Sequence, residues 1–140
     1  MLNIKYLWEL KAHLNPDSTS TYPLHTLNAY VSTNTMAPTP FEIRTYTLSS
    51  QSAAQKYAKR WQAHVPSLET LNINTIGVWT AGENQVVALV RYKNGDDPRE
   101  MTGRFLQSQC FKNDMKGFDM KTIMKVESTL MASVDASPLK

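Results

Sequence analysis

From residue 41 onward, hydrophobic and polar positions follow regular periods that predict alternating strands and helices. The stretch Phe41–Ser50 reads FEIRTYTLSS, whose first odd positions begin an apolar face while Glu42, Arg44 and Tyr46 fall together on the opposite one. Side chains along a strand repeat every second residue, so this stretch is a predicted strand. Its polar row either faces water or lines a polar cavity in which the three groups pair and act.

A helix is predicted directly after this strand. Ser52 and Gln55 match a capping box, in which the two side chains satisfy each other's backbone N–H groups. Apolar residues then recur at helical spacing: Ala54, Tyr57, Ala58, Trp61, Val65 and Leu68.

Two further runs, TIGVWT at 75–80 and NQVVALVRY at 84–92, predict a hairpin because Gly82 between them supplies the positive φ of a tight turn. A turn at Gly82-Glu83 places Trp79 opposite Val86 and Gly77 opposite Ala88. One face of this hairpin then consists of Gly77, Trp79, Val86, Ala88, Val90 and Tyr92. The other, aliphatic face suits contact with helices and consists of Ile76, Val78, Val87 and Leu89.

Asp97, Pro98 and Glu100 have the order of an N-cap, a first-turn proline and a reciprocal capping residue, so they predict a second helix that ends near Asn113. The run KTIMKVESTLMA at 121–132 is rich in β-branched residues and predicts a last strand. The order βαββαβ is that of a ferredoxin-like α+β fold, a four-stranded antiparallel sheet with both helices on one face. A monomer rarely exposes the other face when it is apolar, so a second subunit is expected to cover it.

Composition favours one domain. The chain has 140 residues, of which 41% are hydrophobic, enough for a single core. Residues 1–40 are rich in Ser, Thr, Asn and Pro and are interpreted as a flexible N-terminal extension, with Met36 as an alternative natural start. The predicted domain spans 41–133, and 134–140 form a C-terminal tail.

Charge and motifs exclude several classes of function. A net charge of +3 with 19% charged residues argues against nucleic-acid binding, and no apolar run is long enough to predict stable membrane insertion. The single cysteine, Cys110, excludes an internal disulfide and favours a cytoplasmic location, with a mitochondrial one as the alternative. The chain has no glycine-rich phosphate loop, no histidine pair at metal spacing and no nucleophile elbow, so neither a cofactor nor a metal is predicted.

A family resemblance rests on FEIRTYTL, RW at 60–61, GVWT, NQVVALVRY and the aspartate-led second helix. Together these segments resemble the NIPSNAP family from Phe41 to about Met131. The resemblance implies a homodimeric α+β barrel, in which two sheets meet across a two-fold axis with their open faces inward. Family members often carry a histidine at the position of Ala88 and tryptophans near Val90 and Phe111. All three differ here, which implies a roomier pocket at Ala88 and Val90.

By the same resemblance, the polar row of Glu42, Arg44 and Tyr46 is expected to point into the barrel. The expected site then contains Glu42, Arg44, Tyr46, Trp79, Ala88, Val90, Tyr92, Lys125 and Glu127. One hypothesis is a cofactor-independent enzyme of secondary metabolism that binds an apolar, oxygenated small molecule and acts as a cyclase, isomerase or monooxygenase.

In this hypothesis Arg44 stabilises developing negative charge, Glu42 or Glu127 takes a proton, and Tyr46 or Tyr92 donates one. Trp79 would form a stacking wall, with Ala88, Val90, Tyr92 and Lys125 also contacting the substrate.

Two alternatives stay open. Glu42 and Arg44 can form a structural ion-pair network with Lys125 and Glu127, and the protein is then a non-enzymatic binding or adaptor protein. The two hypotheses differ in the state of one side chain. A reachable, unpaired Arg44 beside an enclosed cavity favours the enzyme, whereas an Arg44 held by carboxylates favours the adaptor.

Overall fold

The computed structural model describes residues 39–140 of the chain. The elements follow in the order β1 (Pro40–Leu48), α3 (Gln51–Glu69), β2 (Ile73–Ala81), β3 (Gln85–Tyr92), α4 (Pro98–Gln107), α5 (Gln109–Asp114), the 3₁₀ turn η2 (Met120–Thr122) and β4 (Ile123–Ala132). The expected order of strands and helices is confirmed. The predicted N-terminal extension, including the alternative start at Met36, lies almost wholly outside the described residues.

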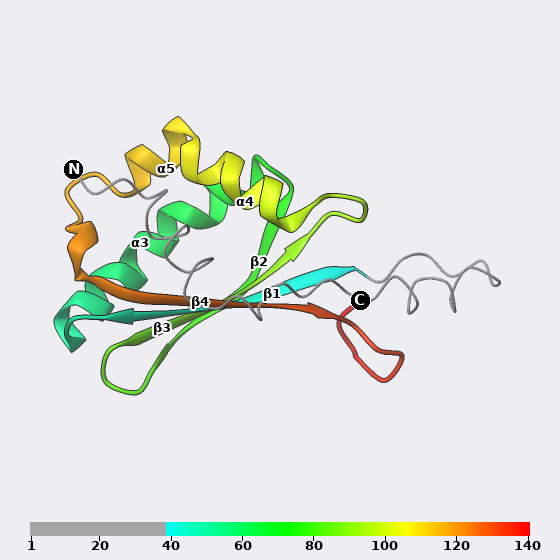
Figure 1. Cartoon of the computed structure of the whole chain (residues 1–140), viewed down its shortest axis with the longest axis horizontal. Coiled ribbons are helices and arrows are strands. Elements are labelled where there is room, and N and C mark those ends of the chain that lie inside the picture. The colour runs from blue at the N-terminus through cyan, green and yellow to red at the C-terminus, as the bar shows by residue number, and fades with distance from the viewer. Residues whose placement is uncertain (1–38) are drawn as a thin grey trace, which may run out of the picture. The chain divides into compact units, whose positions relative to one another are not determined.

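The four strands form one antiparallel sheet in the order β2-β3-β1-β4. The helices α3, α4 and α5 all lie on one side of this sheet (Figure 1). This is the ferredoxin-like arrangement that the sequence predicted. No helix within 39–140 is both long and apolar enough to cross a membrane.

The helix α3 starts two residues earlier than its predicted capping box. Ser50 is the N-cap, and its hydroxyl accepts a hydrogen bond from the N–H of Ala53 at 3.1 Å. The predicted cap at Ser52 is therefore wrong, although the predicted inward face is right. Tyr57, Trp61 and Leu68 are buried against the sheet.

The second predicted helix is interrupted. Asp97 caps α4 as expected, and Pro98 occupies its first turn. At Ser108 the backbone becomes extended, and the Ser108 hydroxyl accepts from the N–H of Phe111 at 3.1 Å, which starts α5. A serine that bonds its own backbone competes with the helical ladder, which explains why one continuous helix to Asn113 does not form.

The hairpin register differs from the prediction by one residue. Ala81 pairs with Gln85 and Trp79 pairs with Val87, so the turn spans 82–84 and begins with Gly82 at φ 56°. A slip of one residue moves a whole strand's side chains to the other face. Val86, Ala88, Val90 and Tyr92 therefore face the helices together with Val78, while Val87 and Leu89 share the opposite face with Trp79 and Gly77.

The core lies between the sheet and the helices. Each large apolar side chain fully buried there stabilises the fold by about 1.5–3 kcal/mol. The buried apolar side chains of this core include Leu48, Tyr57, Trp61, Leu68, Ile73, Val86, Val90, Met101, Phe105 and Phe111.

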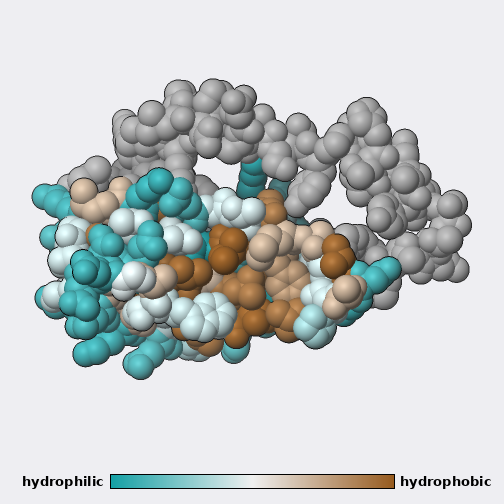
Figure 2. Space-filling model, turned by 90° about the horizontal axis from the view of Figure 1, so that it is seen from below, coloured by the Kyte–Doolittle hydropathy of each residue, from teal (hydrophilic) through white to brown (hydrophobic). Residues whose placement is uncertain are grey.

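The opposite side of the sheet is called here the open face, because none of the described helices covers it. From the strand pairings its residues include Ile43, Thr45, Gly77, Trp79, Val87, Leu89, Lys125, Glu127 and Met131. Apolar side chains gather in the middle of this face (Figure 2). The indole of Trp79 lies over Gly77, where an added Cβ would stand 2.4 Å from Cη2 of Trp79, and the tryptophan is 53% exposed.

Candidate functional site

The polar row of β1 faces the helices, not the open face. Arg44 lies between Ala88 on β3 and Ser128 on β4, and these small neighbours leave room for its guanidinium. Glu42 and Arg44 are each 4% exposed and Tyr46 is 9% exposed. The expectation that this row points to the inside of a barrel is therefore wrong, because the helices α3 and α4 cover it.

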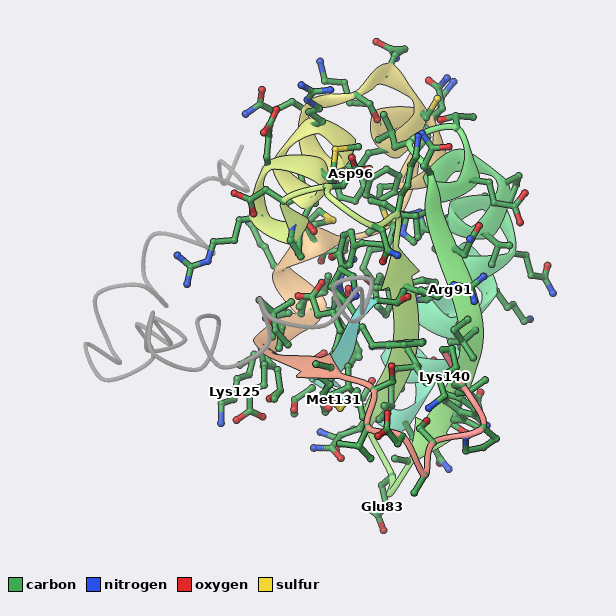
Figure 3. The ribbon with its side chains drawn as sticks, turned by 90° about the vertical axis from the view of Figure 1, so that its right-hand side faces the viewer. Glu83, Arg91, Asp96, Lys125, Met131 and Lys140 are labelled. Atoms are coloured by element: carbon green, nitrogen blue, oxygen red, sulfur yellow. The ribbon has the colours of Figure 1, made fainter. Side chains whose placement is uncertain are left out.

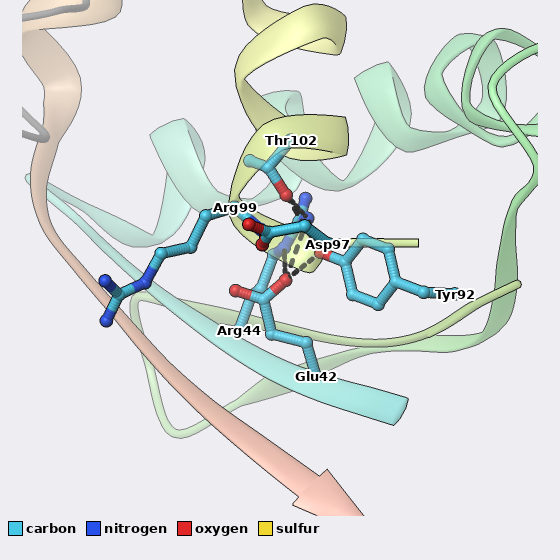
Figure 4. Close-up of polar contacts among 6 residues, drawn as sticks. All are labelled: Glu42, Arg44, Tyr92, Asp97, Arg99 and Thr102. Atoms are coloured by element: carbon cyan, nitrogen blue, oxygen red, sulfur yellow. Dashed lines mark hydrogen bonds and ion pairs between the residues drawn. The ribbon is translucent and has the colours of Figure 1, made fainter. Parts of the chain in front are cut away.

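Arg44 is the centre of a buried hydrogen-bond network, shown in Figure 4. Its Nε donates to Oε2 of Glu42 at 3.0 Å, and its Nη2 donates to the Tyr92 hydroxyl at 2.7 Å and to Oγ1 of Thr102 at 2.8 Å. The Tyr92 hydroxyl also donates to Oε2 of Glu42 and lies 2.8 Å from Oγ1 of Thr102. We call Glu42, Arg44, Tyr92 and Thr102 the Arg44 cluster.

The local structure explains how these four side chains meet. Glu42 and Arg44 are two residues apart on β1 and so share one face. Tyr92 is the last residue of β3. Thr102 lies one turn inside α4, whose start is fixed by the Asp97 carboxylate accepting from the N–H of Arg99 at 2.8 Å.

The electrostatics keep Arg44 charged and Tyr92 protonated near neutral pH. Burial alone lowers the pKa of Arg44, but the electrostatic influence of Tyr46, Glu42 and Tyr92 raises it above its ordinary value, so the guanidinium stays charged. Burial raises the pKa of Tyr92 to about 12, so its hydroxyl keeps its proton and donates. A buried cation that is paired and hydrogen-bonded is held in place, whereas an unpaired one is strongly destabilising.

The expected site residues divide between two faces. Glu42, Arg44, Tyr46 and Tyr92 come together between sheet and helices. Ala88 and Val90 lie on the same side but are 0% exposed, so no roomy pocket forms there.

Trp79, Lys125 and Glu127 lie on the open face, away from Arg44. The Lys125 Nζ pairs with Oε1 of Glu127 at 2.7 Å, and both side chains are at least half exposed. An ion-pair network joining this pair to Arg44 is therefore absent from the described structure, because the sheet separates the two pairs.

Thr102 is the member of the cluster that sequence reasoning missed. It lies four residues after Pro98 and three before the buried Phe105, so it belongs to the inward stripe of α4. A polar residue on an apolar stripe is the signal that could have found it.

A second buried polar group joins α3 to α5. His64 Nδ1 lies 2.9 Å from Oδ2 of Asp114, and the Ser67 hydroxyl donates to Oδ1 of Asp114 at 3.1 Å. Aromatic rings surround His64, with Phe111 stacked on it at 5.7 Å between centroids. Burial lowers the pKa of His64, while the bond with Asp114 acts in the opposite direction.

Neither cluster opens onto an evident binding site. A groove of about 390 Å³ is lined by Thr39, Glu69, Asn72, Asn74, Arg91, Tyr92, Lys93, Asn94 and Lys140. Of the Arg44 cluster, only Tyr92 reaches it. Arg91 is already occupied there, because its Nη1 donates to the backbone carbonyl of Lys140 at 3.2 Å (Figure 3). Residues 39–140 contain no group of three His, Cys, Asp or Glu side chains placed to hold a metal ion.

The antiparallel four-stranded sheet, its one-sided helical layer and the sealed cluster between them define a ferredoxin-like α+β protein. A model of the NIPSNAP family matches residues 41–138. The chain belongs to the NIPSNAP family. The comparison with curated proteins found no match.

Solved structures support the fold. A NIPSNAP family protein with unknown function from Agrobacterium tumefaciens is 20% identical, with a TM-score of 0.62 over 76% of this chain and 97% of that one. A second family protein from the same organism is 24% identical, with a TM-score of 0.57 over 73% and 99% of the two chains. An uncharacterized NIPSNAP-like domain protein from Burkholderia xenovorans is 18% identical, with a TM-score of 0.58 over 73% and 90%.

Proposed function

We propose that this chain is a non-enzymatic binding or adaptor protein of the NIPSNAP type that acts as a homodimer. The observation that carries the proposal is that Arg44 is buried and already hydrogen-bonded to other side chains. Its guanidinium donates to Glu42, Tyr92 and Thr102, and its side chain is 4% exposed. A cation already committed to a carboxylate and two hydroxyls has little capacity left for charge that develops on a substrate.

The homodimer follows from the open face. Ile43, Val87 and Leu89 form its apolar middle, and the half-exposed Trp79 adjoins them. An apolar sheet surface of this kind is usually covered in the working protein. A second copy brings the same apolar surface, so two copies that meet about a two-fold axis cover both. The cytoplasm is the proposed location, with the mitochondrion as the alternative.

The rival proposal is the cofactor-independent enzyme, a cyclase, isomerase or monooxygenase acting on an apolar oxygenated small molecule. One observation favours it: the Arg44 cluster gathers a cation, a carboxylate and a phenol that could exchange protons. Against it, Glu42, Arg44 and Thr102 line no part of the groove beside Tyr92. A substrate would have to open the helical layer to reach them.

Chemical modification of arginine tests the proposal before any ligand is known. The native full-length protein is treated with phenylglyoxal, which reacts with accessible guanidinium groups, and each arginine is followed by peptide mass spectrometry. Arg104, whose side chain is 61% exposed, is the internal control.

We expect Arg104 to react at least tenfold faster than Arg44, because the sheet and helices exclude the reagent from Arg44. Equal rates in a protein that remains folded by circular dichroism would overturn the proposal. They would show that the helical layer opens and would favour the enzyme.

A further inference from the structure

Six basic side chains lie on the helical side of the sheet, on two neighbouring stretches of the chain. Three belong to α3, and three belong to the segment 109–122, which contains α5 and η2. Five of the six are exposed lysines, and the sixth is a half-buried arginine. We call this set the basic surface: Lys56, Lys59, Arg60, Lys112, Lys116 and Lys121.

The segment 109–122 runs beside α3 in the opposite direction. Near the end of α3, the segment is joined to the helix by the contacts of Asp114 described above. In the middle of α3, a Cβ added to Gly117 would stand 3.9 Å from Nη2 of Arg60. Nearer the start of α3, the rings of Tyr57 and Phe118 lie 5.5 Å apart between centroids. The cations of the two stretches therefore border one seam.

None of the six cations forms an ion pair within residues 39–140. The same two stretches contain three acidic residues. Glu69 is the last residue of α3, and Asp114 is buried against His64. Asp119 caps η2, where its carboxylate accepts from the N–H of Lys121 at 3.0 Å. The positive charge of the basic surface is thus left unpaired in the described part of the chain and suits an anionic partner.

Apolar side chains lie among the lysines of this surface. Residues 116–125 read KGFDMKTIMK, in which Phe118 and Met120 are half-buried and Met124 is 64% exposed. Basic side chains are attracted to anionic lipid headgroups, and apolar side chains beside them enter the boundary between headgroups and acyl chains. The combination therefore matches the chemistry of a bilayer surface.

The make-up of the basic surface favours a bilayer over other anionic partners. Lysine is a point charge and does not hold a carboxylate or phosphate through the paired bonds that arginine makes. The groove beside Tyr92 is lined by none of the six cations, so a peptide bound there would not meet them. A bilayer needs neither a groove nor paired bonds, because its headgroups attract any cluster of cations near the surface.

We propose that the basic surface binds an anionic lipid bilayer at the level of its headgroups. This surface lies on the helical side of the sheet, and the open face lies on the other side (Figure 1). The inference goes beyond the proposed function, because it names a partner for the helical side. It holds whether or not two open faces pair.

Co-sedimentation of the full-length protein with vesicles tests this inference. Vesicles of phosphatidylcholine alone are compared with vesicles that also contain phosphatidylserine. The double variant Lys56→Glu/Lys116→Glu reverses one charge on each side of the seam. The matched control, Lys93→Glu/Arg99→Glu, changes the net charge equally between β3 and the first turn of α4, at the opposite end of the helical layer from η2 (Figure 1). All four side chains are exposed, so neither variant disturbs the core.

We expect the wild type to bind the phosphatidylserine vesicles at least tenfold more tightly than the neutral ones, and less tightly as salt screens the charges. A basic residue near an anionic leaflet contributes about fivefold to affinity. The Lys56/Lys116 variant should therefore lose at least tenfold, and the control should lose much less.

Two results would overturn the inference. Equal losses in the two variants would show an effect of net charge alone and would remove the basic surface as the binding site. A wild type that does not prefer phosphatidylserine vesicles would remove the bilayer as the partner. Binding of polyglutamate or of an oligonucleotide in that case would assign the surface to a polypeptide or a nucleic acid instead.

Discussion

The Nη2 atom of Arg44 on β1 lies 2.8 Å from Oγ1 of Thr102 on α4, across 58 positions of the sequence. Oγ1 of Thr102 also forms a hydrogen bond with the Tyr92 hydroxyl. The hydroxyl of Thr102 therefore joins the helical layer to the polar row of the sheet. The row that begins at Glu42 is thus neither a water-facing surface nor part of an open barrel. It is the polar centre of the contact between sheet and helices.

Thr102→Val should lower the free energy of unfolding by about 1–3 kcal/mol, because it leaves a buried N–H of Arg44 without its acceptor and removes the hydroxyl that bonds the Tyr92 oxygen. Thr102→Ser is the matched control, since it keeps the hydroxyl and removes only a methyl group. Urea unfolding of both variants measures the difference. Equal stability of the valine and serine variants would show that the hydroxyl contributes nothing.

Leu89→Glu and Val90→Glu should behave oppositely, although they are neighbours. Leu89 lies on the open face, so a carboxylate there should disrupt the proposed dimer and leave the fold intact. Val90 is 0% exposed under the helices, so the same charge there should prevent stable folding.

Sedimentation at micromolar concentration and circular dichroism measure the two effects. If the Leu89→Glu variant has the same oligomeric state as the wild type, the open face is not the dimer surface. A well-folded Val90→Glu variant would contradict the observed register.

His64 should make the fold less stable in mild acid. Its pKa is lowered below 6.5 in the folded protein, chiefly by burial, so the unfolded chain binds the proton more readily. The stability contributed by neutral His64 is then fully present above pH 6.5 and is lost as the pH falls through that value toward the folded pKa.

Unfolding free energies at pH 7.5, 6.5 and 5.5 measure this effect. The variant His64→Gln, which keeps an amide able to donate to Asp114, is the control and should show a flatter dependence on pH. A wild-type curve parallel to that of the variant would mean that His64 contributes no pH dependence, and that other groups cause any slope.

The sequence predicted the order of elements because each carries a local signal. Asp97 and Pro98 mark the start of α4, and the alternation of β1 places Glu42 beside Arg44. The faces of the hairpin were predicted wrongly because they depend on the length of one turn. Gly82 fits a two-residue or a three-residue turn equally well, and the choice decides whether Val90 or Leu89 faces the helices.

The contents of the clusters depend on long-range contacts, which no local period reports. His64 and Asp114 are 50 residues apart, and nothing near either residue in the sequence indicates the other. The alternation along β4 correctly predicts that Lys125 and Glu127 share one face of the sheet. Which face they share depends on the register of β4 against β1. The sequence therefore identified candidate polar residues of the clusters but did not determine which of their side chains contact one another.

The stability of Arg44→Met tests the central claim, that Arg44 holds the fold together as a sealed, structural residue. Arg104→Met is the matched control, because Arg104 also pairs with a carboxylate, that of Glu100, but at the surface. Chemical denaturation should show a loss of about 3–5 kcal/mol for Arg44→Met, since Glu42 is left buried without its cation. The loss for Arg104→Met should be below about 1 kcal/mol. An Arg44→Met protein as stable as the Arg104→Met control would contradict the account and leave Arg44 available for a catalytic role.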